Sequence, residues 1–436
     1  MPGKIKISNF GPIDKAEIDL DNNFQVFIGE QASGKSTICK VVYFCQKIRD
    51  YTLDFLMDEG QFTQNHENEY FSNYLKYLTQ KFMECFGKTL HMSYFVIEYE
   101  WEDKKIRISL NTDKYIRYRF NEVLKYSIWS LMRETSDMFR FHLNSDKLNS
   151  LMDNVTAVGI VRRRLNDQVC SIFENSDNII YIPAGRSLLA TLSEELNELS
   201  TTRMDLTMRE FITLIRGTRD RFGTKIPEMI KDYTKTVKGQ INNSAVDQAY
   251  DLIRKILKAD YTSEADEERI YFDEQHWVKL MYGSSGQQEA LWILMLAFVT
   301  ILENRKSFIV IEEPEAHLFP EAQKEIIKLI ALLVNVTGSK VILTTHSPYI
   351  LTSANILLYS GKVEGRRLQG KDWIVEKSFR LLYEKFKAYS VQGQRKKTIT
   401  SLMDDESHMI ETEYIDSVSE IINKELEALI EKEYEG

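Results

Sequence analysis

The sequence contains few of the residues that break a fold or cross-link it. Glycine (19) and proline (7) occupy too few of its 436 positions for a linker-rich or low-complexity chain. Its four cysteines (Cys39, Cys45, Cys85 and Cys170) show neither CxxC pairs nor the spacing of metal ligands. We therefore expect no disulfide framework and no zinc site, and a reducing compartment is favoured.

Long hydrophobic runs are also missing. The longest uncharged apolar run, Ala290–Leu302, has 13 residues, whereas about 20 are needed to cross a bilayer. This run predicts a buried helix. The first residues, MPGKIKISNF, lack the charged leader and apolar stretch of a secretion signal. These absences favour a cytoplasmic protein without a membrane partner, and 43% apolar residues suffice for a large core.

An excess of one charge sign is confined to the end of the sequence. Residues 404–436 contain 12 Asp/Glu and 2 Lys, whereas the other 403 residues carry 54 basic and 53 acidic side chains. Binding to DNA, which stays a candidate partner, would therefore need local basic patches. The candidate patches are Arg162–Arg164, Arg216/Arg219/Arg221 and Arg395–Lys397, although such charge runs are more often solvated faces.

A glycine-rich segment follows an apolar strand predicted at 24–28 and precedes a helix predicted from Thr37 to about Ile48. It matches the phosphate-loop pattern GxxxxGK[ST], in which glycines let backbone N–H groups and the helix N-terminus face phosphate. Lys35 is expected to reach the β- and γ-phosphates of a nucleotide, and the Ser36 hydroxyl to bind Mg²⁺. The predicted nucleotide contacts are Gly29, Gln31, Ala32, Ser33, Gly34, Lys35, Ser36 and Thr37.

Two carboxylates end a second apolar strand, predicted at 307–311. Glu312 and Glu313 follow it directly, and Pro314 comes next. Beside a phosphate loop, Glu312 would hold Mg²⁺ directly or through water, and Glu313 would polarise the attacking water. Such a pair is often simply solvated when it stands alone, but the phosphate loop favours catalysis.

Two more segments indicate the same site. Ser284-Ser285-Gly286-Gln287 opens a largely uncharged helix, and such an N-terminus is an anion site suited to a neighbouring chain's γ-phosphate. Alone, it would be read as the N-cap of a core helix. His346 follows an apolar strand at 340–344 and lies 33 residues after Glu313. There it can donate to a γ-phosphate, although a lone histidine is more often structural.

In this order the four segments resemble the ABC-type ATPase superfamily. They correspond to Walker A at 29–37, the signature motif at 284–288, Walker B at 308–313 and the switch histidine, His346. The resemblance covers about residues 1–45 and 178–370.

A narrower resemblance lies in Glu312–Pro320, which is similar to the EEPEAHLHP form of stand-alone bacterial ATPases. These include the heads of OLD-family (overcoming lysogenization defect) nucleases and the ATPase subunits of Septu-like and retron-associated anti-phage systems. Tyr181–Ser187 also resembles a segment of those ATPases. There Arg186 would either lie near the nucleotide or act as a structural ion-pair residue.

The resemblance implies a dimer, or an assembly of dimers, with ATP and Mg²⁺ between Walker A of one chain and the signature of its twin. Ser284, Ser285, Gly286 and Gln287 would act across the interface, and Glu315–Leu318 would form the D-loop. Lys35, Glu313 and His346 would be catalytic, while Ser36 and Glu312 would hold the metal.

The sequence departs from the superfamily pattern at several positions. Glu312 replaces the more usual Asp, and Phe319 stands where many relatives have His. A Q-loop glutamine is not identifiable, because Gln46 lies on the Walker A helix.

The predicted fold class is α/β: an ABC-type ATPase head with mixed β-sheets around a P-loop core, large helical insertions and a C-terminal helix. That helix would dock on the body or, less commonly, bind a partner through its apolar stripe from Tyr414 to Ile430. The predicted parts are the N-terminal ATPase core (1–45), a mostly helical insertion with a β-hairpin near 95–110 (46–177), a core strand with the IPAGR segment (178–195), a helical arm (196–264), the C-terminal ATPase core (265–370) and a helical region with an acidic tail (371–436).

The predicted function is a slow, Mg²⁺-dependent ATPase that dimerises on ATP and serves as sensor or scaffold for a separate effector, a nuclease, in bacterial anti-phage defence. The 90 residues after His346 lack the DxD pair of a Toprim nuclease, so the effector is expected on another chain. One alternative is a RecF-like DNA-repair ATPase that binds DNA with ATP. Another is a signalling module that binds ATP and hydrolyses it negligibly.

Overall fold

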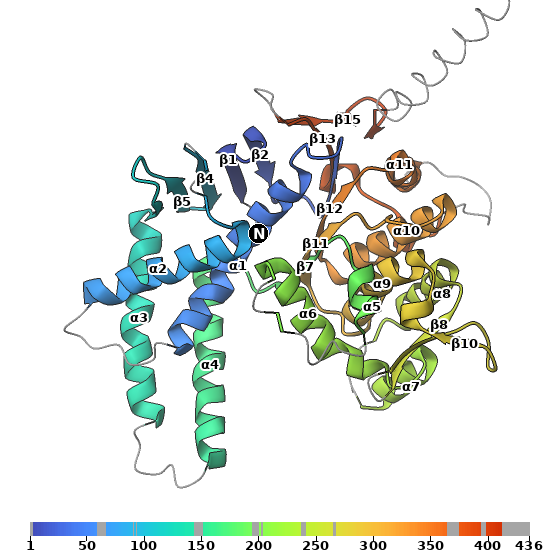
Figure 1. The fold of residues 1–436 in the computed structure, drawn as a ribbon, viewed down its shortest axis with the longest axis horizontal. Coiled ribbons are helices and arrows are strands. Elements are labelled where there is room, and N and C mark those ends of the chain that lie inside the picture. Colours follow the sequence, from blue (N-terminus) through green and yellow to red (C-terminus); the bar gives the residue numbers. More distant parts are fainter. Residues whose placement is uncertain are drawn as a thin grey trace, which may run out of the picture.

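Two β-sheets with one long helix packed between them organise the chain (Figure 1). The computed structural model describes residues 3–58, 67–89, 91–92, 94–143, 151–193, 200–201, 204–236, 241–264, 267–363, 375–393 and 398–411. Sheets and helices both contribute to its core, which confirms the predicted α/β class. The tail from Tyr414 to Ile430 and the basic patch Arg395–Lys397 lie outside the described residues.

The larger sheet has six strands, of which five are parallel and the terminal strand β14 is antiparallel. Three of them, β3, β12 and β11, are buried at every position, as their apolar sequences predict for parallel strands covered on both faces. In spatial order the strands are β14 (Ile399–Ser401), β13 (Phe386–Val391), β3 (Phe24–Ile28), β12 (Lys340–Thr345), β11 (Ser307–Glu312) and β7 (Asn178–Ile182).

The C-terminal part of this sheet corrects the sequence prediction. Residues 371–436 were predicted to be helical, but their described part supplies β13 and β14. Strand β13 pairs in parallel with β3, the strand that leads into the phosphate loop. Two short strands, β15 (Met403–Asp404) and β16 (Met409–Ile410), follow as a hairpin. This region therefore completes the six-stranded sheet.

The second sheet is antiparallel and joins the N-terminus to the predicted insertion. The predicted hairpin near 95–110 forms, but its first strand pairs with β1, and a third strand follows it. The hairpin is therefore part of a sheet that begins with the N-terminal strands. In spatial order the strands are β2 (Ile13–Asp19), β1 (Lys4–Phe10), β4 (Val96–Trp101), β5 (Lys104–Leu110) and β6 (Ile116–Phe120).

Helix α1 (Lys35–Asp58) lies between the two sheets, and buried residues therefore occur all around it. Three further helices extend this side of the molecule: α2 (Glu67–Phe86), α3 (Glu122–Leu143) and α4 (Leu151–Phe173). Helices α3 and α4 pack side by side and project from the body as a pair (Figure 1).

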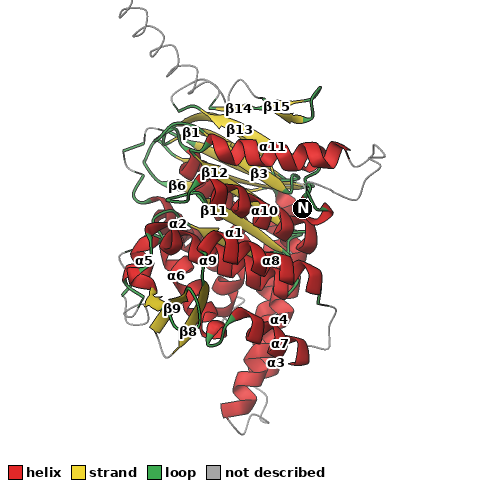
Figure 2. Ribbon diagram, turned by 90° about the vertical axis from the view of Figure 1, so that its right-hand side faces the viewer, coloured by secondary structure: helices red, strands yellow, loops and turns green. Residues whose placement is uncertain are grey.

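The opposite face of the six-stranded sheet is covered by helices that follow β7 in the sequence (Figure 2). The predicted helical arm at 196–264 is mostly helical where it is described, but α8 packs against α9 and α10 and so belongs to the core. The helices are α5 (Ser187–Thr191), α6 (Leu206–Arg219), α7 (Ile226–Thr236), α8 (Asn243–Leu257), α9 (Ser285–Leu302), α10 (Pro320–Thr337), α11 (Pro348–Val363) and the short 3₁₀ turns Asp220–Phe222, Leu280–Tyr282, Lys377–Phe379 and Tyr383–Lys385.

A small antiparallel sheet leads into α9. It consists of β8 (Asp260–Glu264), β9 (Glu267–Tyr271) and β10 (Trp277–Lys279). Helix α9 is apolar and long enough to span a membrane, yet its residues from Glu289 to Leu302 are all buried inside the protein. The predicted buried core helix is thereby confirmed.

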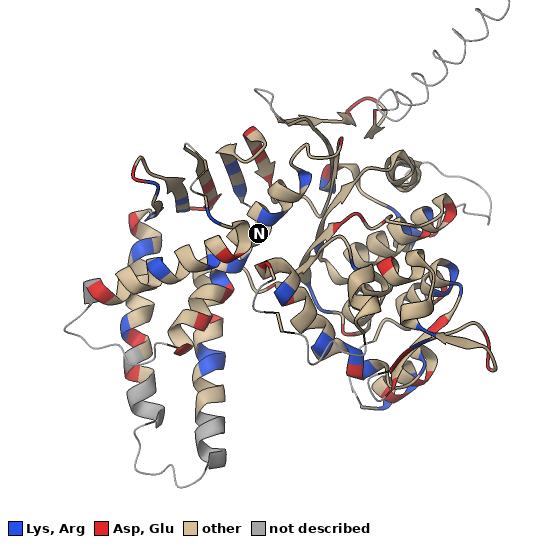
Figure 3. Cartoon of the chain, viewed as in Figure 1, with Lys and Arg blue, Asp and Glu red and all other residues tan. Residues whose placement is uncertain are grey.

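Charged side chains are interspersed along the helices, with Lys and Arg next to Asp and Glu (Figure 3). Of the predicted basic patches, the one on α6 is incomplete at the surface because Arg219 is only 1% exposed. Arg221 pairs with Glu303, and Arg162 lies 3.8 Å from Asp54. Of this candidate patch, Arg219 is therefore not available to a nucleic acid, whereas Arg216 and Arg221 keep the prediction open.

Candidate nucleotide site

The segments predicted to carry the chemistry lie at one edge of the six-stranded sheet. Because β13, β3, β12, β11 and β7 run parallel, their carboxyl ends meet at the same edge. In that order, the strands are followed by residues 392–393, 29–34, 346–347, 313–315 and 183–186. The prediction did not include residues 392–393.

The phosphate loop forms as predicted between β3 and α1. Its backbone passes through the left-handed region at Ala32 (φ 60°) and Gly34 (φ 105°), a geometry that turns successive N–H groups toward one side. The Lys35 side chain folds back over the loop, and its Nζ donates to the carbonyl oxygens of Gly29 and Glu30, at 2.8 Å each. Burial lowers the pKa of Lys35, against the opposing effect of nearby carboxylates.

Strand β13 and the turn after it support the back of the phosphate loop. A Cβ on Gly29 would lie 2.3 Å from the carbonyl oxygen of Val391, so only glycine fits there. Gly393 also packs on Ser33, less closely, since a Cβ there would lie 3.1 Å from the serine carbonyl oxygen. Sequence reasoning missed this support, although the partial alternation in Phe386–Val391 is a strand signal.

The loop offers donors that fit a phosphate group. The Ser33 hydroxyl is buried and has no hydrogen-bond partner among the residues that the structure describes. An unpaired hydroxyl inside a turn of backbone N–H groups suits an anion that accepts from all of them. Gln31, Ala32 and Ser36 are exposed and Thr37 is half-buried, so these predicted contacts are accessible to a ligand.

Glu313 and His346 meet across neighbouring strand ends. His346 Nε2 lies 3.1 Å from Glu313 Oε1, and both side chains are partly exposed. Glu313 adopts φ 45°, and its N–H donates to the Thr344 carbonyl oxygen at 3.0 Å. Left-handed backbone at a non-glycine residue is strained and concentrates at functional sites. The two predicted catalytic residues therefore lie in contact with each other, and both are partly exposed.

Glu315 supports the histidine, a role that sequence reasoning missed when it placed this residue only in the D-loop. Its Oε1 accepts hydrogen bonds from the Thr345 hydroxyl (2.6 Å) and the His346 N–H (2.9 Å). Burial raises the pKa of Glu315. Glu315 thereby fixes the backbone of His346 relative to the loop that follows β11.

Glu312 is buried, and both of its carboxylate oxygens already accept hydrogen bonds. The Tyr181 hydroxyl donates to Oε1 at 2.8 Å, and the Ala184 N–H donates to Oε2 at 3.0 Å. Tyr181 stays a neutral donor because burial, together with the charge of Glu312, raises the pKa of its phenol well above the ordinary value. Of the two predicted Mg²⁺ contacts, direct and through water, this arrangement favours the one through water.

At the start of α9, some side chains cap the helix and one is free to contact a ligand. Ser284 and Gln287 form a capping box, in which the Ser284 Oγ accepts from the Gln287 N–H and the Gln287 side chain accepts from the Ser284 N–H. Ser285 is exposed, and its hydroxyl has no partner within the described part of the chain. Among these residues Ser285 is the one free to bind a ligand.

Gly286 has a structural reason to be glycine. A Cβ there would lie 2.8 Å from the carbonyl oxygen of His317, within the predicted D-loop. The signature and D-loop segments therefore touch within one chain. No hydrogen bond or ion pair among the described residues joins segment 284–287 to the phosphate loop.

Comparison with known proteins gives the family. The family model described as "AAA ATPase domain" matches residues 1–351. The chain belongs to this family. No curated protein matches the chain.

Several solved structures resemble this AAA ATPase domain only distantly. An Smc head bound to the C-winged helix domain of ScpA is 12% identical, with 93% of this chain and 98% of that chain covered and a TM-score of 0.41. An Smc head with an extended coiled coil, bound to the C-terminal domain of ScpA derived from Pyrococcus furiosus, is 14% identical, with 96% and 99% covered and a TM-score of 0.38. The SMC head domain from Thermotoga maritima is 10% identical, with 81% and 91% covered and a TM-score of 0.35.

Two roles were expected for Arg186 of this ATPase domain, a place near the nucleotide or a structural ion pair, and the structure shows the ion pair. Its side chain is fully buried, and its Nη2 lies 3.4 Å from Glu289 Oε2. Each of its three guanidinium nitrogens donates to a backbone carbonyl oxygen. Arg186 therefore lies beside Walker B without being exposed to a nucleotide.

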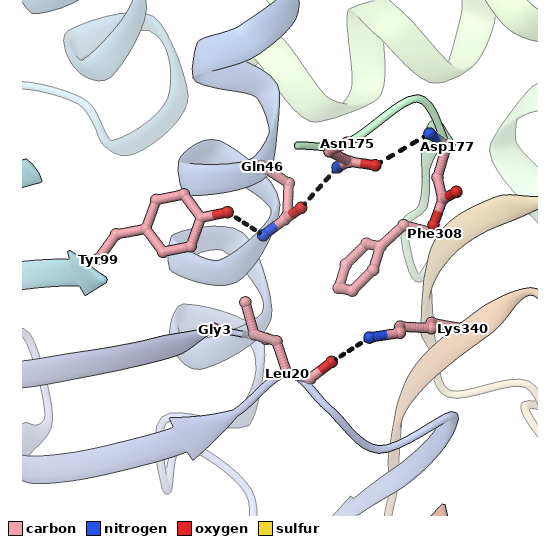
Figure 4. A pocket seen from close by; sticks show the side chains of 8 residues that line it. All are labelled: Gly3, Leu20, Gln46, Tyr99, Asn175, Asp177, Phe308 and Lys340. Atoms are coloured by element: carbon pink, nitrogen blue, oxygen red, sulfur yellow. Dashed lines mark hydrogen bonds between the residues drawn. The ribbon is translucent and has the colours of Figure 1, made fainter. Parts of the chain in front are cut away.

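Gln46 is excluded as a nucleotide contact, in agreement with its position on α1. Its amide nitrogen donates to the Tyr99 hydroxyl and its oxygen accepts from Asn175, both at 2.9 Å (Figure 4). The cavity that it lines measures about 10 Å³, which is room for about one water molecule. On the same cavity wall, Lys340 donates to the Leu20 carbonyl oxygen at 2.6 Å.

Proposed function

We propose that this AAA ATPase domain binds ATP with Mg²⁺ and hydrolyses it at a site that two copies of the chain complete. The observation that carries the proposal is the contact between Glu313 and His346, 3.1 Å apart. Their strands lie in the same sheet as β3, and the carboxyl ends of all three meet at the edge that carries Lys35. A candidate base, a cation for the phosphates and a hydrogen-bond donor to the γ-phosphate thus lie at the same sheet edge.

Each of these side chains has a task. Lys35 would move from the loop carbonyls that it now contacts to the β- and γ-phosphates. Glu313 would orient and deprotonate water, and the partly exposed His346 would donate to the γ-phosphate. Ser36 would hold Mg²⁺ together with water bound to Glu312; the metal would neutralise charge on the phosphates.

Exposed apolar side chains flank the motifs and support dimerisation through this face. Phe319 and Tyr282 are 76% and 72% exposed, and Leu188 and Tyr349 are each 54% exposed. Each lies within a few residues of a predicted site segment. Exposed apolar side chains mark an interaction surface where they form one contiguous patch, and we propose that these four do so. A second copy placed there would cover them while its Ser285 reaches the first copy's γ-phosphate.

We further propose that the dimer controls a separate effector, a nuclease, in bacterial anti-phage defence, and that it works in the cytoplasm. The support is the resemblance of Glu312–Pro320 to the ATPases of such systems. Helices α3 and α4, which project from the body, offer a recognition element outside the ATPase core (Figure 1). Slow turnover suits this task, because hydrolysis then times a switch.

Single-turnover hydrolysis and light scattering test the ATPase proposal together. Wild type should hydrolyse bound ATP and return to monomers. Glu313→Gln should slow hydrolysis by about 10²–10⁴-fold, the contribution of a general base, while it accumulates a dimer with ATP. Unchanged hydrolysis in Glu313→Gln, or a wild type that stays monomeric with trapped ATP, would contradict the proposal.

Infection assays test the effector proposal. The chain is expressed with the protein encoded by the neighbouring reading frame, and phage plating is compared between wild type and Lys35→Ala. Protection that needs both proteins and is lost in Lys35→Ala supports the proposal. A permease as the neighbouring protein would contradict it.

A further inference from the structure

The Arg186 guanidinium holds three parts of the site together from inside the protein. It donates to the carbonyl oxygens of Pro183 (2.6 Å), Glu289 (2.7 Å), Glu312 (2.7 Å) and Glu313 (2.9 Å). These carbonyls belong to the segment after β7, to α9 and to the end of Walker B. A planar fork of donors suits acceptors at fixed positions, which a lysine cannot reproduce.

Glu289 attaches this arginine to the start of α9. Its carboxylate accepts from the backbone N–H groups of Arg186 and Ser187, at 3.1 Å each, and pairs with the guanidinium. Glu289 lies four residues after Ser285, about 6 Å along the same helix. A shift of the exposed first turn of α9 would therefore move Glu289 with it.

Glu313 is anchored by its backbone on both sides. Its N–H donates to the Thr344 carbonyl oxygen, and its own carbonyl oxygen accepts from Arg186. These two bonds hold the residue at φ 45°, which costs free energy unless the surroundings enforce it. Arg186 is therefore one of the groups that set the position of the proposed general base.

We propose that Glu289 and Arg186 are positioning residues that transmit the engagement of Ser285 by a second chain to the backbone of Glu313. The proposal rests on the ATP-dependent dimer proposed above. Dense interiors pass on displacements instead of absorbing them, and the middle of this path, from Glu289 through Arg186 to the Glu312 carbonyl oxygen, consists of contacts between buried groups. The binding of a second chain at Ser285 would thus both complete the site and fix the position of Glu313 for hydrolysis.

A purely structural role is the competing explanation. A buried ion pair that only joins α5, α9 and β11 would also lower stability when it is broken. Only the coupling predicts that a change on α9 alters the backbone at residue 313, since Glu289 reaches Glu313 through Arg186.

Hydrogen exchange in the nucleotide-free chain separates the two explanations. Glu289→Gln keeps the shape of the side chain but turns one acceptor into a donor. We expect exchange in residues 313–316 to accelerate about tenfold, as for the loss of one hydrogen bond to a charged group. Arg186→Lys should have the same effect, and the double variant should add little, because the two residues act through one path. Unchanged exchange at 313–316 would overturn the proposal.

Arg49→Lys is the matched control. Arg49 also donates to two backbone carbonyls, of Asn175 (2.9 Å) and Asp177 (2.8 Å), but these lie before β7 and not beside Glu313. This variant should lower thermal stability and leave exchange at 313–316 unchanged. Faster exchange there in Arg49→Lys would show a general loosening of the fold and would overturn the proposal.

Single-turnover kinetics give a second readout. Glu289→Gln should slow the hydrolysis step by about 10–100-fold, as expected for a misplaced catalytic group, with ATP affinity within about twofold of wild type. An equal loss in affinity and rate would place these residues in binding and contradict the proposal. If wild type itself does not hydrolyse ATP, the proposed function fails, whereas the exchange result still decides the coupling.

Discussion

The phosphate loop and the start of α9 are built from the same parts but are enclosed differently. Both place glycine and serine at a helix N-terminus, where backbone N–H groups can face an anion. In the phosphate loop, Lys35 is buried and Gly29 lies against Val391 of strand β13. At the start of α9, Ser285 and Tyr282 are exposed.

This difference shows which half of the site a single chain completes. The phosphate loop is supported by strand β13 of the same chain, so we expect one copy to be sufficient to hold the nucleotide there. The start of α9 packs against β9 and the His317 carbonyl oxygen. The Ser285 hydroxyl, in contrast, has no hydrogen-bond partner among the described residues. In the proposed dimer the start of α9 is the half that a second copy covers, and four predictions test this comparison.

Mixing two inactive variants would give the largest effect. Lys35→Ala removes the cation of the phosphate loop, and Ser285→Arg blocks the start of α9. Each alone should lose hydrolysis by about 100-fold or more. Mixed equally, they should recover about a quarter of wild-type phosphate release, since half of randomly assembled symmetric dimers are mixed and each mixed dimer has one intact site.

The control is a mixture of Lys35→Ala with Glu313→Gln. Both substitutions lie on the same half of the site, so mixed dimers contain no intact site and activity should stay low. Recovery in this control, or none in the test mixture with both variants folded, would show that the two halves do not meet across an interface.

The close contact behind the phosphate loop predicts the next largest effect. Gly29→Ala would bring a Cβ to 2.3 Å from the Val391 carbonyl oxygen. Strands β3 and β13 would have to separate, at a cost of about 3 kcal/mol of unfolding free energy, and ATP binding should weaken. Denaturant unfolding and nucleotide titration measure both.

Gly217→Ala serves as the control, because Gly217 is an exposed helical residue of α6 with open space around its Cα. This variant should gain about 1 kcal/mol and bind ATP as wild type does. Equal behaviour of the two variants would mean that β13 does not support the loop.

The sheet beneath the start of α9 should make that half sensitive to pH. Burial raises the pKa of Glu268 on β9 from 4.5 to about 7. The stability that the protonated carboxyl contributes is fully present below pH 4.5 and is lost as pH rises through 7. Between pH 5 and 8 wild type should therefore lose about 3 kcal/mol of unfolding free energy that Glu268→Gln retains.

Denaturant unfolding at the two pH values measures this loss. Glu267→Gln on the same strand is the control, because the pKa of Glu267 is lowered by Lys279 and Arg269 and does not titrate in this range. The same pH dependence in wild type and Glu268→Gln would contradict the prediction.

The smallest effect concerns the apolar rim of the proposed interface. Phe319→Ser should weaken the ATP-dependent dimer by about tenfold, since a phenylalanine contributes about 1.5–3 kcal/mol when it is buried, and should leave the folded monomer unchanged. Tyr115→Ser is the control, because Tyr115 is 73% exposed, close to the 76% of Phe319, but lies between β5 and β6. Each substitution is combined with Glu313→Gln, which slows ATP hydrolysis, and sedimentation measures the dimer dissociation constant with ATP. Equal weakening of the dimer by both substitutions would mean that Phe319 does not lie in the interface.

Local patterns in the sequence were enough for part of the site. The apolar runs of β11 and β12 predicted strands buried on both faces, and the residues that follow β3, β11 and β12 predicted the phosphate loop and the candidate roles of Glu313 and His346. These features depend on neighbours within a few residues and on the rule that parallel strands share a carboxyl edge.

Other parts of the site depend on partners that are distant in the sequence. Strand β13 pairs with β3 across more than 350 residues, and a strand's neighbour is chosen by packing of whole faces, not by its own short pattern. The partners of Arg186 are backbone carbonyls, which carry no sequence signal.

The sequence by itself therefore determined which residues are candidates for the chemistry, because phosphate binding and water activation require particular side chains at short, fixed spacings. Only the tertiary structure decided what supports them. The enclosure of the loop by β13, the hold of Glu315 on His346 and the link through Arg186 arise from close packing of buried groups, which becomes defined only when distant segments meet.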